Sequence, residues 1–192
     1  MLRERVDAGK NAGIVVGLLD AGGRRIVAYG TSGRRGLPLD GQTLFEIGSI
    51  SKVLTAAVLG DAVARGEVGL GQPVKTLLPR GISVPSRQGR EITLGDLASH
   101  TSGLPRMPAD LPEETQDDDT WASYDVRRLY TFLAAYRLPR VPGTGYEYSS
   151  LGVALLGHAL ALKAGTSYEA LVIRRRCCRS SVADWHFGVC AG

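Results

Sequence analysis

The segment Phe45-Glu-Ile-Gly-Ser-Ile-Ser-Lys52 decides the fold of this 192-residue chain. It follows a glycine-rich stretch and leads into a helical pattern that continues to about Arg65, where Gly66 provides a stop signal. Five apolar side chains are predicted to form the buried face of this helix: Val53, Leu54, Ala57, Val58 and Leu59. The segment therefore predicts that Ser49 lies at the N-terminus of a long helix that packs on a core.

Ser49 and Lys52 have a spacing that suits nucleophilic catalysis. A serine hydroxyl is a poor nucleophile until a base takes its proton. If Ser49 opens the helix, Lys52 lies one turn further along on the same face, within reach of the hydroxyl, and a desolvated lysine can act as a base. The helix dipole also favours negative charge that develops at Ser49. By itself, however, the spacing is more often a helix cap followed by a surface lysine, and about one chance match is expected in a chain this long.

The residues before this segment predict a β-hairpin. Residues 13–19 form an apolar, β-branched run, Asp20-Ala-Gly-Gly23 has turn chemistry, and residues 24–29 read as a second strand. Residues 30–41 are rich in glycine and predict a loop.

The residues after it predict mainly helices. Residues 67–91 are expected to be irregular because three prolines interrupt them. Helices are predicted over 94–99 with Thr93 as N-cap, over 125–137, over 149–163 with Gly165 as the stop, and from Ser167 onward. The predicted helix 125–137 is expected to face inward with four side chains: Leu129, Phe132, Leu133 and Tyr136.

Composition and charge exclude several classes of function. The chain is 44% hydrophobic and 22% charged, which predicts one soluble domain with a core. Its net charge is +4, but residues 171–192 hold four arginines against one aspartate, a net +3 that leaves only +1 for the first 170 residues. A broad basic surface for nucleic acid is therefore not predicted.

No metal, cofactor or membrane span is predicted. All three cysteines lie between Cys177 and Cys190 and lack the spacing of a zinc site. Residues 110–119 carry six acids and are interpreted as a solvated loop, with metal binding as the less favoured alternative. The apolar runs 13–19 and 153–162 are too short to cross a bilayer, and nothing at the start resembles a signal peptide.

Several further segments, in the same order along the chain, resemble the serine β-lactamase and penicillin-binding protein superfamily. Besides Ser49-Ile-Ser-Lys52, they are the segment 66–79, Ile92-Thr-Leu-Gly-Asp-Leu-Ala-Ser-His-Thr-Ser-Gly-Leu-Pro105 and Pro142-Gly-Thr-Gly-Tyr-Glu-Tyr-Ser-Ser-Leu-Gly152. The resemblance covers about residues 10–172 and is strongest to the class C branch, in particular its D-alanyl-D-alanine carboxypeptidase/endopeptidase group. It implies an α/β (α+β) fold: the N-terminal portion of the β-lactamase/transpeptidase-like fold, with a partial antiparallel sheet and a helical region but without the C-terminal strands.

The resemblance also implies a role for each matching residue. Ser49 would be the nucleophile, Lys52 its base, and Tyr148 a member of the proton relay that later helps to activate water; the alternative for Tyr148 is a core tyrosine. Ser150 stands where the family usually has an asparagine that binds the substrate's amide, so substrate binding at Ser150 is expected to differ, since serine offers one hydroxyl in place of an amide. His100 is expected to support the site without acting as a base, and His158 to be a packing or surface residue.

The implied function is that of a serine acyl hydrolase. It would act through a Ser49 acyl-enzyme on D-Ala-D-Ala peptides of peptidoglycan or on β-lactams, without a cofactor. The alternatives are an esterase of the same fold and a non-catalytic fragment or penicillin-binding remnant; a basic interaction module built on residues 174–179 ranks last. The family implies a place outside the cytoplasmic membrane, whereas the missing signal peptide predicts the cytoplasm for the chain as written.

The end of the chain predicts a truncated enzyme. Related enzymes carry a later Lys-Thr-Gly or His-x-Gly motif, and none follows Tyr148. Residues 1–172 are therefore interpreted as an incomplete domain with negligible turnover, because an oxyanion donor and part of the binding site are expected to be absent. Residues 173–192 change abruptly to arginine and cysteine, and we interpret them as a tail outside the family domain that results from a change of reading frame.

Overall fold

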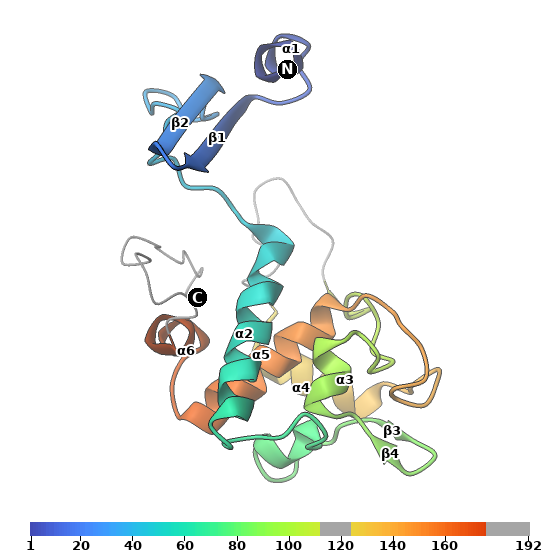
Figure 1. Cartoon of the computed structure of the whole chain (residues 1–192). Helices are drawn as coiled ribbons and strands as arrows, with labels where there is room; N and C mark the ends of the chain where they lie inside the picture. Colours follow the sequence, from blue (N-terminus) through green and yellow to red (C-terminus); the bar gives the residue numbers. More distant parts are fainter. Residues whose placement is uncertain (112–123, 176–192) are drawn as a thin grey trace. The chain divides into compact units, whose positions relative to one another are not determined.

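The structure is a computed structural model that describes residues 1–111 and 124–175. It divides into two units, Met1–Ile47 and Gly48–Gly192. Figure 1 shows their helices and strands in chain order. The predicted acidic loop 110–119 lies almost wholly outside the described residues, as does the predicted tail 173–192 apart from its first three residues.

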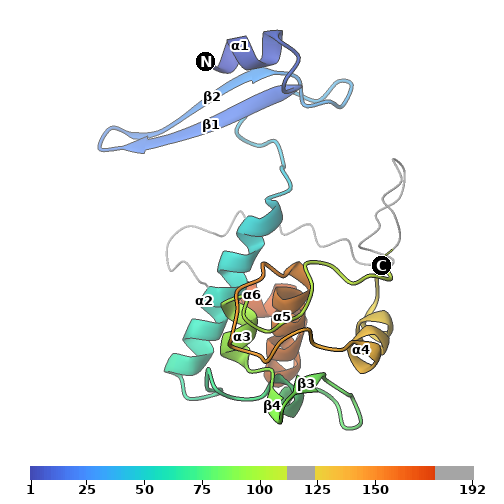
Figure 2. The ribbon, with the colours of Figure 1, turned by 90° about the vertical axis from the view of Figure 1, so that its right-hand side faces the viewer.

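The first unit contains the predicted hairpin. Helix α1 (Leu2–Asp7) precedes strands β1 (Gly13–Asp20) and β2 (Gly23–Gly30), which pair antiparallel along their whole length with Asp20 opposite Gly23. The Asp20 carboxylate accepts a hydrogen bond from the Gly22 N–H at 2.8 Å, and it pairs with Arg25 at 2.9 Å. Gly23 has a φ of 102°, a conformation that favours glycine. The partial antiparallel sheet is therefore confirmed, and its two strands lie side by side in Figure 2.

The second unit is built around helix α5 (Ser150–Ala164). Most residues of this helix are apolar and buried, and Leu155, Leu156 and Ala159 have no exposed surface. Helices α2 (Ser51–Ala64), α3 (Leu94–Ala98) and α6 (Tyr168–Arg175) pack against it, as Figures 1 and 2 show. The long apolar helix of the sequence is thus the centre of the core.

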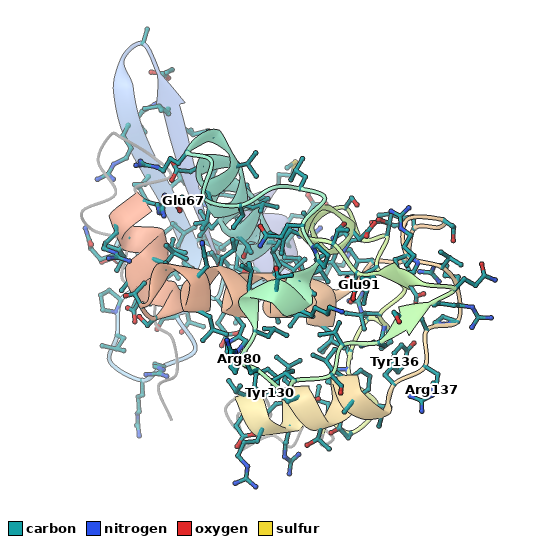
Figure 3. All side chains as sticks on the ribbon, turned by 90° about the horizontal axis from the view of Figure 1, so that it is seen from below. Glu67, Arg80, Glu91, Tyr130, Tyr136 and Arg137 are labelled. Atoms are coloured by element: carbon teal, nitrogen blue, oxygen red, sulfur yellow. The ribbon has the colours of Figure 1, made fainter. Side chains whose placement is uncertain are left out.

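The remaining elements frame this core. Short 3-10 helices occur at η1 (Gly48–Ile50) and η2 (Val74–Leu77), and β3 (Ser86–Arg87) pairs with β4 (Arg90–Glu91), so the segment predicted to be irregular contains one short hairpin. Helix α4 (Val126–Ala135) begins at its N-cap Asp125. Its Tyr130, labelled in Figure 3, lies on the side that faces α5 and hydrogen-bonds to His158 at 2.7 Å. His158 is therefore a packing residue.

The prediction for the buried face of α2 is partly wrong. The buried residues are Thr55, Val58, Leu59 and Ala62, which follow the helical spacing of one face. Val53 is 66% exposed, and Ala57 is exposed as well. The reason is that α2 carries apolar residues on more than one side, so that the sequence pattern did not define a single face.

Ion pairs of Arg175, the last residue of helix α6, join this helix to α2 and to the segment that follows α2. The Arg175 guanidinium contacts the carboxylates of Asp61 at 2.6 Å and of Glu67 at 2.5 Å, and Glu67 is labelled in Figure 3. Its hydrogen bonds lower the pKa of both carboxyl groups. The first three residues of the predicted tail therefore continue α6, and Arg175 makes specific contacts with the domain.

Helix α3 begins with the predicted cap, and this gives a test of local stability. The Thr93 hydroxyl accepts from the Asp96 N–H at 3.1 Å, while the Asp96 carboxylate accepts from the Thr93 N–H at 3.0 Å. We expect Thr93→Ala to lower the free energy of unfolding by about 1 kcal/mol because one donor at the helix end loses its partner. Urea denaturation measures this change. Thr93→Ser, which keeps the hydroxyl, should stay close to the wild type, and an equal loss in both variants would contradict the capping role.

Candidate active site

Ser49 and Lys52 meet at the start of α2. Ser49 lies in η1, immediately before the helix, and Lys52 lies in the first turn of α2. The Lys52 ammonium donates a hydrogen bond to Ser49 Oγ at 3.2 Å. The helix starts two residues later than predicted, but the short 3-10 turn keeps the two side chains on one side. The contact expected from the three-residue spacing is therefore present.

Tyr148 completes the cluster from the far end of the sequence. Its phenol donates a hydrogen bond to Ser49 Oγ at 2.7 Å, and the Lys52 ammonium lies 5.2 Å from the centre of its ring. Hydrogen bonding with Ser49, and next with Lys52, lowers the pKa of the Tyr148 phenol below its usual 10. One serine oxygen thus accepts from both a lysine and an acidified phenol, an arrangement suited to moving the serine proton.

His100 holds Tyr148 in place through the backbone on either side of it. The Glu147 N–H donates to the His100 carbonyl at 2.8 Å, and the Ser149 N–H donates to His100 Nδ1 at 3.1 Å. The imidazole also lies against the phenol ring, with 4.6 Å between the ring centres. His100 adopts a φ of 60° to make these contacts. These contacts connect His100 to the Ser49 cluster through Tyr148, and its supporting role stays a prediction.

The protonation state of His100 fits this role. Burial lowers the pKa of its imidazole, and the nearby positive charge of Lys52 lowers it further. At neutral pH the ring therefore stays uncharged, and Nδ1 remains free to accept the Ser149 N–H.

Ser150, the predicted substrate-binding residue, is the first residue of α5. Its backbone N–H donates to the carbonyl of Arg106 at 2.9 Å. In the part of the chain that the structure describes, its hydroxyl makes no hydrogen bond with Ser49, Lys52 or Tyr148. The structure thus brings three of the four predicted site residues together and leaves the Ser150 hydroxyl apart from them.

Two residues that support the site were missed. Ser149 is 1% exposed; its hydroxyl accepts from the Gly152 N–H at 2.8 Å and donates to the Pro105 carbonyl at 2.6 Å, which ties the start of α5 to the Gly-Leu-Pro segment. A serine directly before a helical pattern is a cap signal, so it was detectable. The Arg106 guanidinium lies 5.1 Å from the centre of the Tyr148 ring. No pattern in the sequence pointed to that contact.

The described residues offer no metal site of three or more histidine, cysteine, aspartate or glutamate side chains. The cluster around Ser49 presents donors and cations instead. Across residues 1–111 and 124–175, no helix has the length and apolar character that crossing a membrane requires.

Solved structures define the class of protein. A beta-lactamase/D-alanine carboxypeptidase from Yersinia pestis, crystallised with citrate, is similar with a TM-score of 0.77 and 27% identity over 89% of this chain and 48% of that one. A class C beta-lactamase from Rhodobacter sphaeroides is similar with a TM-score of 0.67 and 32% identity over 90% of this chain and 45% of that one. The fold is therefore the N-terminal portion of the class C-like serine β-lactamase fold.

Sequence comparison then gives the family. The family model described as Beta-lactamase matches residues 1–191, and the chain belongs to this family. A beta-lactamase of Escherichia coli K12 is 37% identical over 133 residues, which are 69% of this chain and 32% of that protein. The D-alanyl-D-alanine-carboxypeptidase/endopeptidase AmpH of the same strain is 33% identical over 130 residues, which are 67% and 33% of the two chains. The chain thus spans less than half the length of these relatives.

Proposed function

We propose that the chain forms an acyl-enzyme at Ser49 with β-lactams or with D-Ala-D-Ala peptides of peptidoglycan. The observation that carries this proposal is the convergence of Lys52 Nζ and the Tyr148 phenol on Ser49 Oγ, at 3.2 and 2.7 Å. Ser49 is the nucleophile. Its oxygen attacks the carbonyl carbon of the substrate, the carbon–nitrogen bond breaks, and an ester links the acyl group to Ser49.

The proton moves within the Lys52–Tyr148 pair. At a pH above the lowered pKa of Tyr148, the Lys52–Tyr148 pair has lost one proton. The pair can then take the proton of Ser49 as the attack begins. The same pair then gives a proton to the leaving nitrogen. After acylation, Tyr148 helps to activate the water that attacks the ester. Lys52 is thus the base named by the sequence, and Tyr148 is its relay partner.

Ser150 is proposed to face the substrate's amide on the acyl side of the reacting carbonyl. A hydroxyl donates and accepts through a single oxygen, whereas an asparagine amide accepts through its oxygen and donates through its nitrogen. Ser150 should therefore orient the substrate's amide less strictly than an asparagine would. The full reaction, hydrolysis of β-lactams or cell-wall peptides outside the cytoplasmic membrane, is proposed for the whole protein.

The pH dependence of acylation tests this proposal. We expect the rate of labelling by a fluorescent penicillin to rise with pH and to level off above the pKa of Tyr148, below the usual value of 10, because only the deprotonated pair accepts the Ser49 proton. In Tyr148→Phe this rise should disappear, and the plateau rate should fall about a hundred-fold or more. A wild-type rate that falls with rising pH, or a Phe variant with the wild-type profile, would contradict the proton relay.

Hydrolysis of simple esters is the second candidate function. It is favoured by Ser150, which lacks an amide, and whose hydroxyl makes no hydrogen bond to the Ser49 cluster in residues 1–111 and 124–175. Cleavage of p-nitrophenyl acetate that requires Ser49, together with no labelling by penicillin, would select the esterase. If neither reagent reacts with Ser49, the chain is a non-catalytic fragment.

A further inference from the structure

Arg106 is a cation at the site whose charge adds to the lowering of the Tyr148 pKa but which has no contact with the substrate in the proposed reaction. Its guanidinium lies 5.1 Å from the centre of the Tyr148 ring, and the residue is exposed. Within the part of the chain that the structure describes, its side chain has no carboxylate partner. Arg140 and Arg175, by contrast, each contact a carboxylate at 2.7 Å or less. Among the residues that the structure describes, the charge of Arg106 is thus exposed and forms no ion pair.

The backbone of Arg106 is held firmly although its side chain is exposed. Its carbonyl accepts from the Ser150 N–H at 2.9 Å and from the Leu151 N–H at 3.2 Å, and the preceding carbonyl of Pro105 accepts from the Ser149 hydroxyl at 2.6 Å. These bonds attach Arg106 to the first turn of α5, directly beside Ser150. A side chain on an anchored backbone loses less conformational freedom when it binds a ligand.

The charges around Tyr148 favour an anion at this position. The ammonium of Lys52 and the guanidinium of Arg106 both face the phenol ring, at 5.2 and 5.1 Å from its centre. Neither cation forms an ion pair with a described carboxylate. Because Lys52 donates a hydrogen bond to Ser49, Arg106 is the better placed of these two cations for a contact with the substrate. A guanidinium also matches the two oxygens of a carboxylate with parallel donors, which an ammonium does not.

We propose that Arg106 binds a carboxylate on the acyl side of the substrate and thereby selects acyl groups that carry a negative charge. We choose the acyl side because the backbone of Arg106 is bonded to that of Ser150, the residue to which the proposed function assigns the substrate's acyl-side amide. The inference rests on the proposed function, since it requires that Ser49 is acylated. It makes Arg106 a specificity-determining residue.

Two penicillins that differ by one carboxylate test this inference. Carbenicillin is benzylpenicillin with an added carboxylate on its acyl side chain. The second-order rate constant of acylation for each is measured on the full chain by competition with a fluorescent penicillin. We expect the ratio of carbenicillin to benzylpenicillin to fall about ten-fold in Arg106→Gln, because a charge-assisted bond to the extra carboxylate is lost. Arg106→Lys keeps the positive charge but lacks the parallel donors of a guanidinium. Its ratio should lie between those of the wild type and Arg106→Gln.

The outcomes separate the inference from the proposed function. A loss in Arg106→Gln that is equal for both penicillins means that Arg106 acts through Tyr148 or the fold, and the inference is wrong. The inference is also wrong if the carbenicillin-to-benzylpenicillin ratio of the wild type does not change with salt concentration, because the added attraction is electrostatic. This measurement needs no variant and therefore does not depend on whether a variant folds. If neither penicillin acylates the wild type, the proposed function fails first and the inference falls with it.

Discussion

The Ser49→Ala variant is expected to lose covalent labelling by penicillin entirely, with a drop in acylation rate of at least about a thousand-fold. Lys52 and Tyr148 both direct their hydrogen bonds to Ser49 Oγ. Alanine removes the one oxygen that they share and leaves no hydroxyl at that point. The measurement is the rate at which a fluorescent penicillin becomes bound to the denatured protein, which reports only covalent attachment.

A second serine in the same segment provides the matched control. Ser51 stands two residues away, and its hydroxyl donates to the Gly48 carbonyl at 2.8 Å. Ser51→Ala should therefore label within about two-fold of the wild type. If Ser49→Ala labels as fast as the Ser51→Ala control, another residue is the nucleophile and the assignment of Ser49 is wrong.

Lys52→Met is expected to slow acylation about a thousand-fold while the protein remains folded. Methionine keeps the length and the apolar stem of the side chain but removes the ammonium that donates to Ser49 Oγ at 3.2 Å. Tyr148 then has no amine with which to share the serine proton. Loss of a general base typically lowers the reaction rate a hundred- to ten-thousand-fold. The measurement is the second-order acylation rate constant at pH 7, with thermal unfolding as a check of stability.

The same substitution at an exposed lysine separates catalysis from a general effect of charge. Lys10 lies in the other unit and is exposed, so Lys10→Met should leave the acylation rate unchanged. A Lys52→Met variant that acylates at the wild-type rate would show that Tyr148 suffices as base. A loss in both variants would show that the net charge of the chain, and not Lys52, controls the reaction.

Local features were predictable from the sequence because nearby residues determine them. The turn at Asp20 to Gly23, the Thr93 cap and the apolar run that became α5 all follow from spacing within a few residues. The contact between Ser49 and Lys52 also follows from one helical turn. Tyr148 is different, because 99 residues separate it from Ser49, and spacing over that distance fixes no contact. It was identified only through the resemblance of its segment to a known family.

Tertiary contacts could not be predicted from the sequence pattern. Which side of α2 is buried depends on where α5 and α6 lie, and Val53 was therefore assigned to the wrong face. Arg106 approaches Tyr148 only because two loops are joined through the start of α5. Arg175 gave no signal beyond its charge, and its pairs with Asp61 and Glu67 arise from the packing of α6 on α2. Each of these depends on contacts distant in sequence.

The most direct measurement is the intact mass of the wild-type chain after incubation with benzylpenicillin, followed by mapping of the modified peptide. We predict a mass increase equal to that of one whole antibiotic molecule, carried by the peptide that contains Ser49. An unchanged mass at saturating antibiotic, or an adduct on a peptide without Ser49, would contradict the central claim that Lys52 and Tyr148 prepare this serine for acylation.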